Sequence, residues 1–108
     1  MTHPLVHHDL FGGRGKVTVE LERQGEPRGF ACVLRCALAP RGRVGLHEQE
    51  ACDELVIVLS GRGRALTDGA RTALKPGVVV PVPLGTQLSL ENTSPSAPLR
   101  YLIVKARP

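Results

Sequence analysis

Glycine and proline interrupt this chain so often that no helix of useful length fits between them. The 108 residues contain 12 glycines and 9 prolines, and both residue types end regular elements. Between them, apolar and polar residues alternate, so that Val17, Val19 and Leu21 share one face of residues 16–22. Such alternation is typical of half-buried strands. We therefore expect an all-β fold with no substantial helix, either a barrel or a sandwich.

The expected strands are short, and turn signals separate them. They cover residues 16–22, 29–38, 55–59, 63–67, 71–74, 78–82, 86–92 and 99–105. Asp68 and Gly69 form a strong hairpin signal between two of these strands. Three glycines before residue 16 break any regular element, so residues 1–14 are expected to form an N-terminal arm. Residues 15–108 are then a single domain.

Composition excludes several classes of partner. The formal charge is +4, from 14 basic and 10 acidic residues that are scattered along the sequence. Because no basic cluster with interleaved aromatic residues is visible, we expect no nucleic-acid partner. No stretch approaches the roughly 18 apolar residues of a membrane span, and the N-terminus does not resemble a signal peptide. Three cysteines, Cys32, Cys36 and Cys52, are interpreted as free thiols in a reducing cytoplasm.

Three polar residues precede or open the most apolar stretch of the chain. His47 and Gln49 lie two residues apart, so on a strand their side chains leave from the same face. Glu54 follows five residues later and opens the apolar run 55–59. Polar groups beside such a strand must find partners in one another, in water, in a ligand or in a metal.

The spacing of these residues resembles the first motif of the cupin superfamily. That motif is a glycine, five residues, His-x-His, three or four residues, a glutamate, six residues and a glycine. His47, Glu54 and Gly61 match it, whereas Gln49 stands at the second histidine and Gly42 lies one place late.

The second cupin motif also has a counterpart here. It is a glycine, five residues, Pro-x-Gly, two residues, a histidine, three residues and an asparagine. Gly77, Pro83, Gly85 and Asn92 match every spacing, but Leu88 stands at the histidine position. The resemblance implies a small β-barrel built as a double-stranded jelly roll.

Cupins with the full ligand set hold iron, manganese, zinc or nickel with three histidines and a glutamate. By this resemblance, His47, Gln49 and Glu54 would form a metal set that has lost an imidazole, so its affinity should fall. Cys52 would be a soft fourth donor, or would lie in the loop before the strand. In a metal-free pocket, His47 would instead hydrogen-bond to Glu54 or Gln49, and Leu88 would widen an apolar lining around a small organic ligand.

Three functions follow from these alternatives, and the sequence leaves open whether the protein is an enzyme. The first is small-molecule binding by His47, Gln49, Glu54, Leu88 and Tyr101, with metal absent or weakly held. The second is a metal-dependent oxygenase, isomerase or lyase acting on a small polar substrate, with Glu54 or Tyr101 moving protons. The third is metal-free sugar epimerisation, with His47 as base and Tyr101 as acid. Core packing is the competing interpretation of Tyr101.

Two further features concern assembly and the N-terminus. Residues 55–59 and 99–104 are apolar on both faces, so part of the outer sheet should be covered, and a homodimer is expected. The arm contains His3, His7 and His8. Three neighbouring histidines suggest a metal site, but such arms are more often mobile or packed on another subunit.

Overall fold

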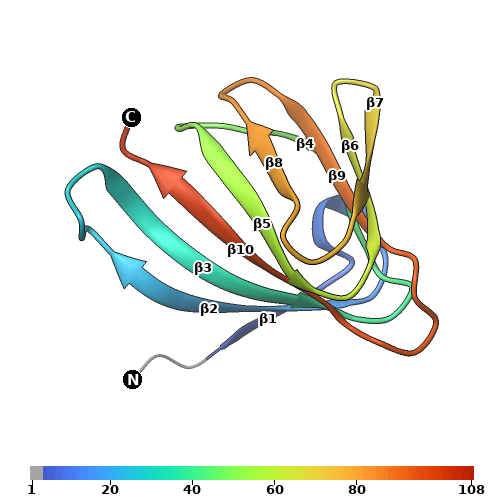
Figure 1. Ribbon diagram of the computed structural model, residues 1–108. Helices are drawn as coiled ribbons and strands as arrows, with labels where there is room; N and C mark the ends of the chain where they lie inside the picture. Colours follow the sequence, from blue (N-terminus) through green and yellow to red (C-terminus); the bar gives the residue numbers. More distant parts are fainter. Residues whose placement is uncertain (1–3) are drawn as a thin grey trace.

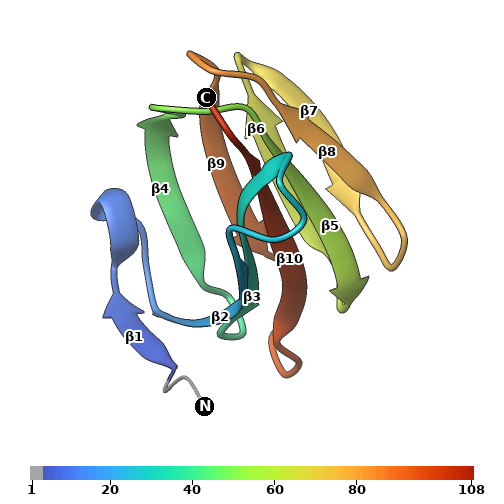
Figure 2. The same ribbon diagram turned by 90° about the vertical axis from the view of Figure 1, so that its left-hand side faces the viewer.

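Two antiparallel β-sheets face each other and enclose the core (Figure 1 and Figure 2). The computed structural model describes residues 4–108. The elements are β1 (Leu5–His8), the 3-10 helix η1 (Leu10–Gly12), β2 (Lys16–Gln24), β3 (Phe30–Leu38), β4 (Arg43–Glu48), β5 (Glu54–Ser60), β6 (Gly63–Thr67), β7 (Ala70–Leu74), β8 (Val79–Val82), β9 (Gln87–Asn92) and β10 (Leu99–Ala106). The all-β expectation is confirmed.

The chain crosses repeatedly between the two sheets. The six-stranded sheet has the order β1-β2-β3-β10-β5-β8, and the four-stranded sheet has the order β4-β9-β6-β7. From β4 onward, the strands therefore alternate between sheets, except that β6 and β7 form a hairpin within one. This alternation is the jelly-roll arrangement expected from the sequence. No helix in residues 4–108 is long and apolar enough to cross a membrane.

Aliphatic side chains from both sheets fill the interior. Val56, Val82 and Leu99 in the six-stranded sheet are completely buried, and Leu88 and Leu90 face them from β9. Each lies two residues from the next inward position on its strand, as the alternation of a pleated strand requires. Burying a side chain of this size contributes about 1.5–3 kcal/mol. The core therefore consists mainly of Val and Leu side chains, since aromatic residues are scarce.

One buried asparagine joins the two sheets at one end of the barrel. The side-chain nitrogen of Asn92 donates to the carbonyls of Leu38 at 3.1 Å, Ala39 at 3.1 Å and Ala97 at 2.8 Å. Its side-chain oxygen accepts a hydrogen bond of 2.9 Å from the Ser94 backbone N–H. The asparagine of the second motif thus holds the end of β3 and the β9–β10 loop together.

Part of the expected arm is a strand at the edge of the six-stranded sheet. β1 pairs with β2 in the register Leu5↔Val19 and His7↔Val17. His7 and His8 are consecutive strand residues, so their side chains leave from opposite faces and cannot converge on one ion. His3 lies outside the described residues. Residues 4–14 are therefore paired with the barrel over β1 and approach β4 over η1.

Candidate functional site

A row of inward-facing residues crosses the six-stranded sheet at the open end of the barrel. Lys105 on β10 lies opposite Cys32 of β3 on one side and Glu54 of β5 on the other, and Glu54 lies opposite Val82 of β8. β3 and β5 begin here, whereas β8 and β10 end here. The strand register thus places an ammonium, a carboxylate and a thiol side by side.

Lys105 and Glu54 form an ion pair inside this end of the barrel. The Lys105 Nζ atom donates to Glu54 Oε2 at 2.9 Å, and the side chains are 30% and 3% exposed. Burial by itself disfavours the charged ammonium. The hydrogen bond and negative charge of Glu54, together with Cys52 and Cys32, outweigh this effect and raise the pKa of Lys105. Lys105 is therefore charged near neutral pH, and Glu54 is its counter-ion.

His47 points into the barrel from β4, directly opposite Leu88 of β9. Its ring stacks on Phe11, with the centroids 3.9 Å apart and the planes at 12°. Its Nδ1 atom lies 2.9 Å from the carbonyl oxygen of Gly45. A Cβ at Gly45 would lie 1.9 Å from the Phe11 carbonyl oxygen, so only glycine lets η1 lie this close to β4. The 3-10 helix thus covers the imidazole.

Gln49 lies just beyond β4, not on the strand as the two-residue spacing suggested. It is 4% exposed, and its side-chain nitrogen donates to the Cys52 carbonyl at 3.0 Å, with Cys52 Sγ at 3.8 Å. Its backbone is held by Thr86 and Gly85 across the barrel. Gln49 therefore closes the loop that leads to Glu54. The hydrogen bond expected from His47 to Glu54 or Gln49 does not form: each of the three has other partners within residues 4–108.

Tyr101 lies four residues before Lys105, on the same inward face of β10. Its side chain is 2% exposed and hydrogen-bonds to the Cys36 thiol. Burial, followed by the negative charge and hydrogen bond of Cys36, raises the pKa of Tyr101 well above its usual value. Burial likewise raises the pKa of Cys36 to about 12. The two groups form a neutral pair beneath the Lys105–Glu54 pair.

The contacts do not fit a transition metal held by His47, Gln49 and Glu54. Within residues 4–108, no three His, Cys, Asp or Glu side chains are arranged so that they could hold a metal ion. An oxygen of Glu54 already accepts from an ammonium, which has no lone pair to offer and repels a second cation. Leu88 offers no donor opposite His47, whose ring is covered by Phe11.

Sequence reasoning missed Lys105, although a signal for it was present. Tyr101, Ile103 and Lys105 alternate along the strand expected over residues 99–105, so they share one face. A lysine at an inward position near a motif glutamate is a candidate counter-ion. No sequence pattern indicated that Phe11 would cover the His47 ring, because that contact depends on the close approach of η1 to β4.

Solved structures similar to this chain include a predicted oxalate decarboxylase from Thermotoga maritima, which is 28% identical. That match covers 99% of this chain and 94% of the other, with a TM-score of 0.88. A cupin-2 domain protein from Rhodospirillum rubrum is 21% identical over 97% of this chain and 69% of the other, with a TM-score of 0.82. A cupin-like protein from Thermotoga maritima is 23% identical over 88% and 71%, with a TM-score of 0.74.

Comparison with curated proteins found no match, whereas a family model gave a clear one. The model of the Cupin domain family matches residues 34–105, which is well over half of the chain. The matched segment runs from β3 to β10 and contains both motifs and the Lys105–Glu54 pair. Sequence motifs, jelly-roll topology and family match agree, and the chain belongs to the cupin family.

Proposed function

We propose that this cupin binds a small organic molecule at the open end of its barrel, with metal absent or weakly held. The observation that carries the proposal is the Lys105–Glu54 ion pair. Glu54 occupies the glutamate position of the first cupin motif, where the family uses a carboxylate as a metal ligand. Here the positive charge beside that carboxylate is an ammonium from β10.

The free N–H groups of Lys105 favour a ligand that carries an acceptor oxygen. An ammonium has three donors, and a single hydrogen bond, to Glu54, accounts for one of them among the contacts of residues 4–108. With 30% of its side chain exposed, Lys105 is accessible at the barrel mouth. A carbonyl or carboxylate oxygen suits the remaining donors.

A mostly apolar hollow lies at the same end of the six-stranded sheet, but on its outer face and not inside the barrel. It has a volume of about 280 Å³ and lies where β3 and β5 begin and β8 and β10 end. Its lining residues are Phe30, Asp53, Glu54, Leu55, Pro81, Val82, Pro83, Val104 and Ala106. Most of these residues alternate with the inward-facing positions of their strands, so the sheet separates this hollow from the ion pair.

Metal analysis and ligand titration test this proposal together. Protein purified without added metal should contain well below one transition-metal atom per chain. Oxalate and benzoate serve as probes, and at least one should raise the melting temperature of the wild type but not of Lys105→Met. Lys75→Met, which removes an exposed lysine from the β7–β8 turn, is the matched control and should respond like the wild type. Stoichiometric iron, zinc, nickel or manganese that is lost in His47→Ala would overturn the proposal.

The second candidate is a metal-dependent enzyme of the oxygenase, isomerase or lyase type. Its support is the 28% identity to the predicted oxalate decarboxylase over almost the whole chain. His47, Gln49 and Glu54 would bind the metal, and Glu54 or Tyr101 would move protons. The Lys105 ammonium and Leu88 both weigh against this candidate. Metal-dependent release of CO₂ from oxalate would favour it.

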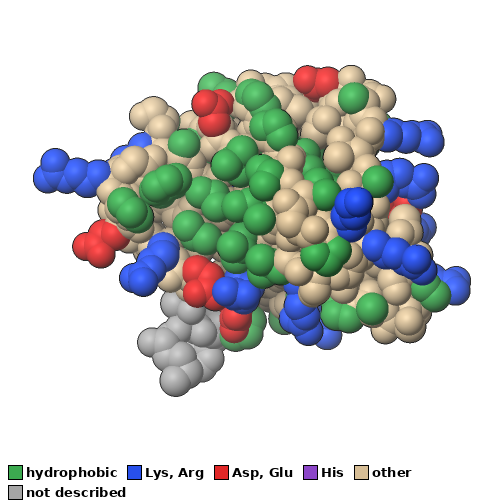
Figure 3. Space-filling model, in the orientation of Figure 1, with side chains coloured by type: hydrophobic (Ala, Val, Ile, Leu, Met, Phe, Trp, Pro, Cys, Tyr) green, Lys and Arg blue, Asp and Glu red, His purple; other side chains and the backbone are tan. Residues whose placement is uncertain are grey.

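We also propose that the protein is a homodimer, formed through the outer face of the six-stranded sheet. Hydrophobic side chains gather in the middle of this face (Figure 3), over β3, β10 and β5. Exposed apolar residues there include Phe30, Leu55, Leu59 and Val79. Burying such a patch against a second copy removes it from water. Light scattering should give twice the chain mass, and a mass near 11.6 kDa would contradict the dimer.

A further inference from the structure

Arginines from distant parts of the sequence gather on the outer face of the four-stranded sheet. Arg43 on β4 and Arg64 on β6 both lie opposite Glu91 of β9, so the three form a row across the sheet. Arg71 on β7 lies opposite Leu66 of β6, in the neighbouring row. Arg14 joins them because its backbone bridges to that of Arg43. No cluster is visible in the sequence, since the fold assembles it.

Two shallow hollows lie on this face and share Arg64 and Glu91. The first has a volume of about 290 Å³ and is lined by Arg43, Arg64, Leu66, Arg71, Ser89 and Glu91. The second is lined by Arg14, Arg41, Arg64, Glu91, Asn92 and Thr93. Glu91 is the one acidic residue in the lining of either hollow.

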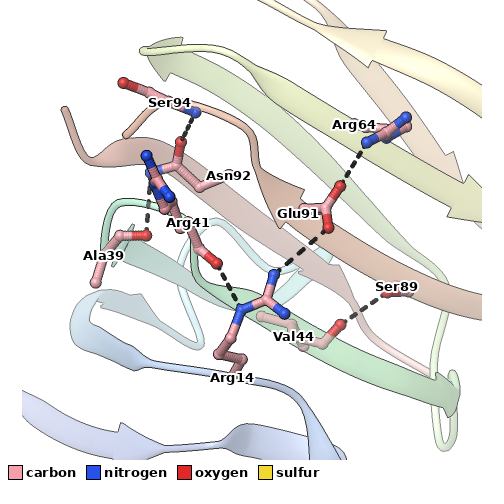
Figure 4. A network of polar contacts seen from close by, with 9 residues as sticks. All are labelled: Arg14, Ala39, Arg41, Val44, Arg64, Ser89, Glu91, Asn92 and Ser94. Atoms are coloured by element: carbon pink, nitrogen blue, oxygen red, sulfur yellow. Dashed lines mark hydrogen bonds and ion pairs between the residues drawn. The ribbon is translucent and has the colours of Figure 1, made fainter. Parts of the chain in front are cut away.

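The charges on this face are unbalanced. Glu91 binds Arg64 at 2.7 Å and lies 3.7 Å from Arg14 (Figure 4). Across residues 4–108, no ion pair or hydrogen bond engages the guanidinium groups of Arg43 and Arg71. The linings of the two hollows contain five arginines, including Arg41, and one carboxylate, which leaves a surplus of four positive charges here.

We propose that this face binds a small phosphorylated molecule that carries at least two anionic groups. Guanidinium groups pair with phosphate through two parallel N–H donors, and Arg43 and Arg71 are available for this. Their strands, β4 and β7, are separated by two others and are therefore about 14 Å apart. A ligand that contacts both arginines must present separate anionic groups toward each side of the hollow.

Other occupants fit this face less well. No aromatic residue lines either hollow, so the face lacks the stacking platforms that single-stranded nucleic acids use. A second copy of the chain would bring two positively charged faces together, which is unfavourable. A molecule of the size of a triphosphate matches both the charge and the volume.

Calorimetric titration with tripolyphosphate at low ionic strength tests the proposal. The wild type should bind, and Arg43→Gln and Arg71→Gln should each weaken binding about tenfold, the effect of removing a charged hydrogen-bonding partner. Arg28→Gln is the matched control, because Arg28 is an exposed arginine in the β2–β3 turn, away from this sheet (Figure 1). It should leave the affinity unchanged. The exposed positions of all three arginines favour normal folding, which the melting temperature checks.

A variant that should bind tripolyphosphate more tightly than the wild type provides a second test. Glu91→Gln removes the one carboxylate and releases Arg14 and Arg64 for the ligand, so tripolyphosphate should bind several-fold more tightly. Absence of tripolyphosphate binding, or an equal loss in Arg28→Gln, would overturn the proposal. Tighter binding of duplex DNA than of tripolyphosphate, lost in Arg43→Gln, would instead identify a nucleic-acid surface and would also overturn it.

Discussion

Replacing Lys105 by methionine should reveal how strongly the buried carboxylate depends on its counter-ion. Methionine keeps an unbranched apolar stem of similar length but removes the charge. Glu54, with 3% of its side chain exposed, would then have neither water nor an ammonium to stabilise its charge. The variant therefore isolates the electrostatic part of the interaction.

The exposure of the two side chains sets the expected magnitude. Removing one partner of a fully buried ion pair costs about 3–5 kcal/mol, whereas exposed pairs contribute about 0–1 kcal/mol. Because Lys105 is 30% exposed and Glu54 is 3% exposed, we expect a loss between these limits, about 2 kcal/mol for Lys105→Met. In a domain of this size, that corresponds to a fall in melting temperature of about 8 °C.

Removing the charge of Glu54 instead of Lys105 should lower the free energy of unfolding by less. In Glu54→Gln, the long Lys105 side chain can turn its ammonium toward solvent, so the loss should be about 1 kcal/mol. The double variant should lose less than the sum of the two single variants, because the pair is then removed as a unit. Urea unfolding of the wild type and the three variants measures this coupling energy.

A surface ion pair provides the control for the same measurement. Arg35 and Glu22 pair on the outer face of the six-stranded sheet, with side chains 49% and 39% exposed. Their coupling, measured with Arg35→Gln and Glu22→Gln, should be clearly smaller than that of Lys105 and Glu54. Equal coupling energies would refute the reasoning, since they would mean that water screens the pair in the barrel as fully as a pair on the surface.

Four further predictions concern other buried groups. Zinc titration by calorimetry should show a clear gain in affinity for Leu88→His combined with Lys105→Met, and little gain for Leu88→His alone. Because the pKa of Cys36 rises from 9.0 to about 12, its thiol should be the slowest of the three to react with iodoacetamide at pH 8, as peptide mass spectrometry can show. The same rise means that Cys36 stabilises the fold below pH 9 and loses this effect toward pH 12, by about 1.4 kcal/mol per pH unit; Cys36→Ala should flatten the alkaline limb of the stability profile. Asn92→Ala should lower the free energy of unfolding by about 3 kcal/mol, because three carbonyls and an N–H lose their partner.

Most of the fold was predictable because alternation and turn residues are local signals. The strand expected over residues 63–67 coincides with β6, and that expected over residues 16–22 lies within β2. The hydrogen-bonded edge strand β1 was not predicted, since its four residues are stabilised by pairing with β2. The register shift between Val44 and His47 was also missed, because it accompanies the close packing of η1 on β4.

The candidate site was predictable to a lesser extent, because motif spacing identifies positions and not their partners. The motifs placed His47, Glu54 and Leu88, but Glu54 pairs with a residue 51 positions away. The arginine face could not be predicted at all. Arg14, Arg43, Arg64 and Arg71 meet only because the strand order brings their elements together.

Charge balance links Lys105 to Leu88, one of the two positions at which this chain departs from the cupin metal set. A buried carboxylate requires a positive partner, whether that partner is a metal ion or an ammonium. Replacing the motif histidine with Leu88 weakens any metal held near Glu54, and the carboxylate would then be left uncompensated. Lys105 supplies the missing charge from the adjacent strand. Restoring a histidine while Lys105 remains would offer a metal a carboxylate that is already neutralised, so metal binding requires both positions to change together.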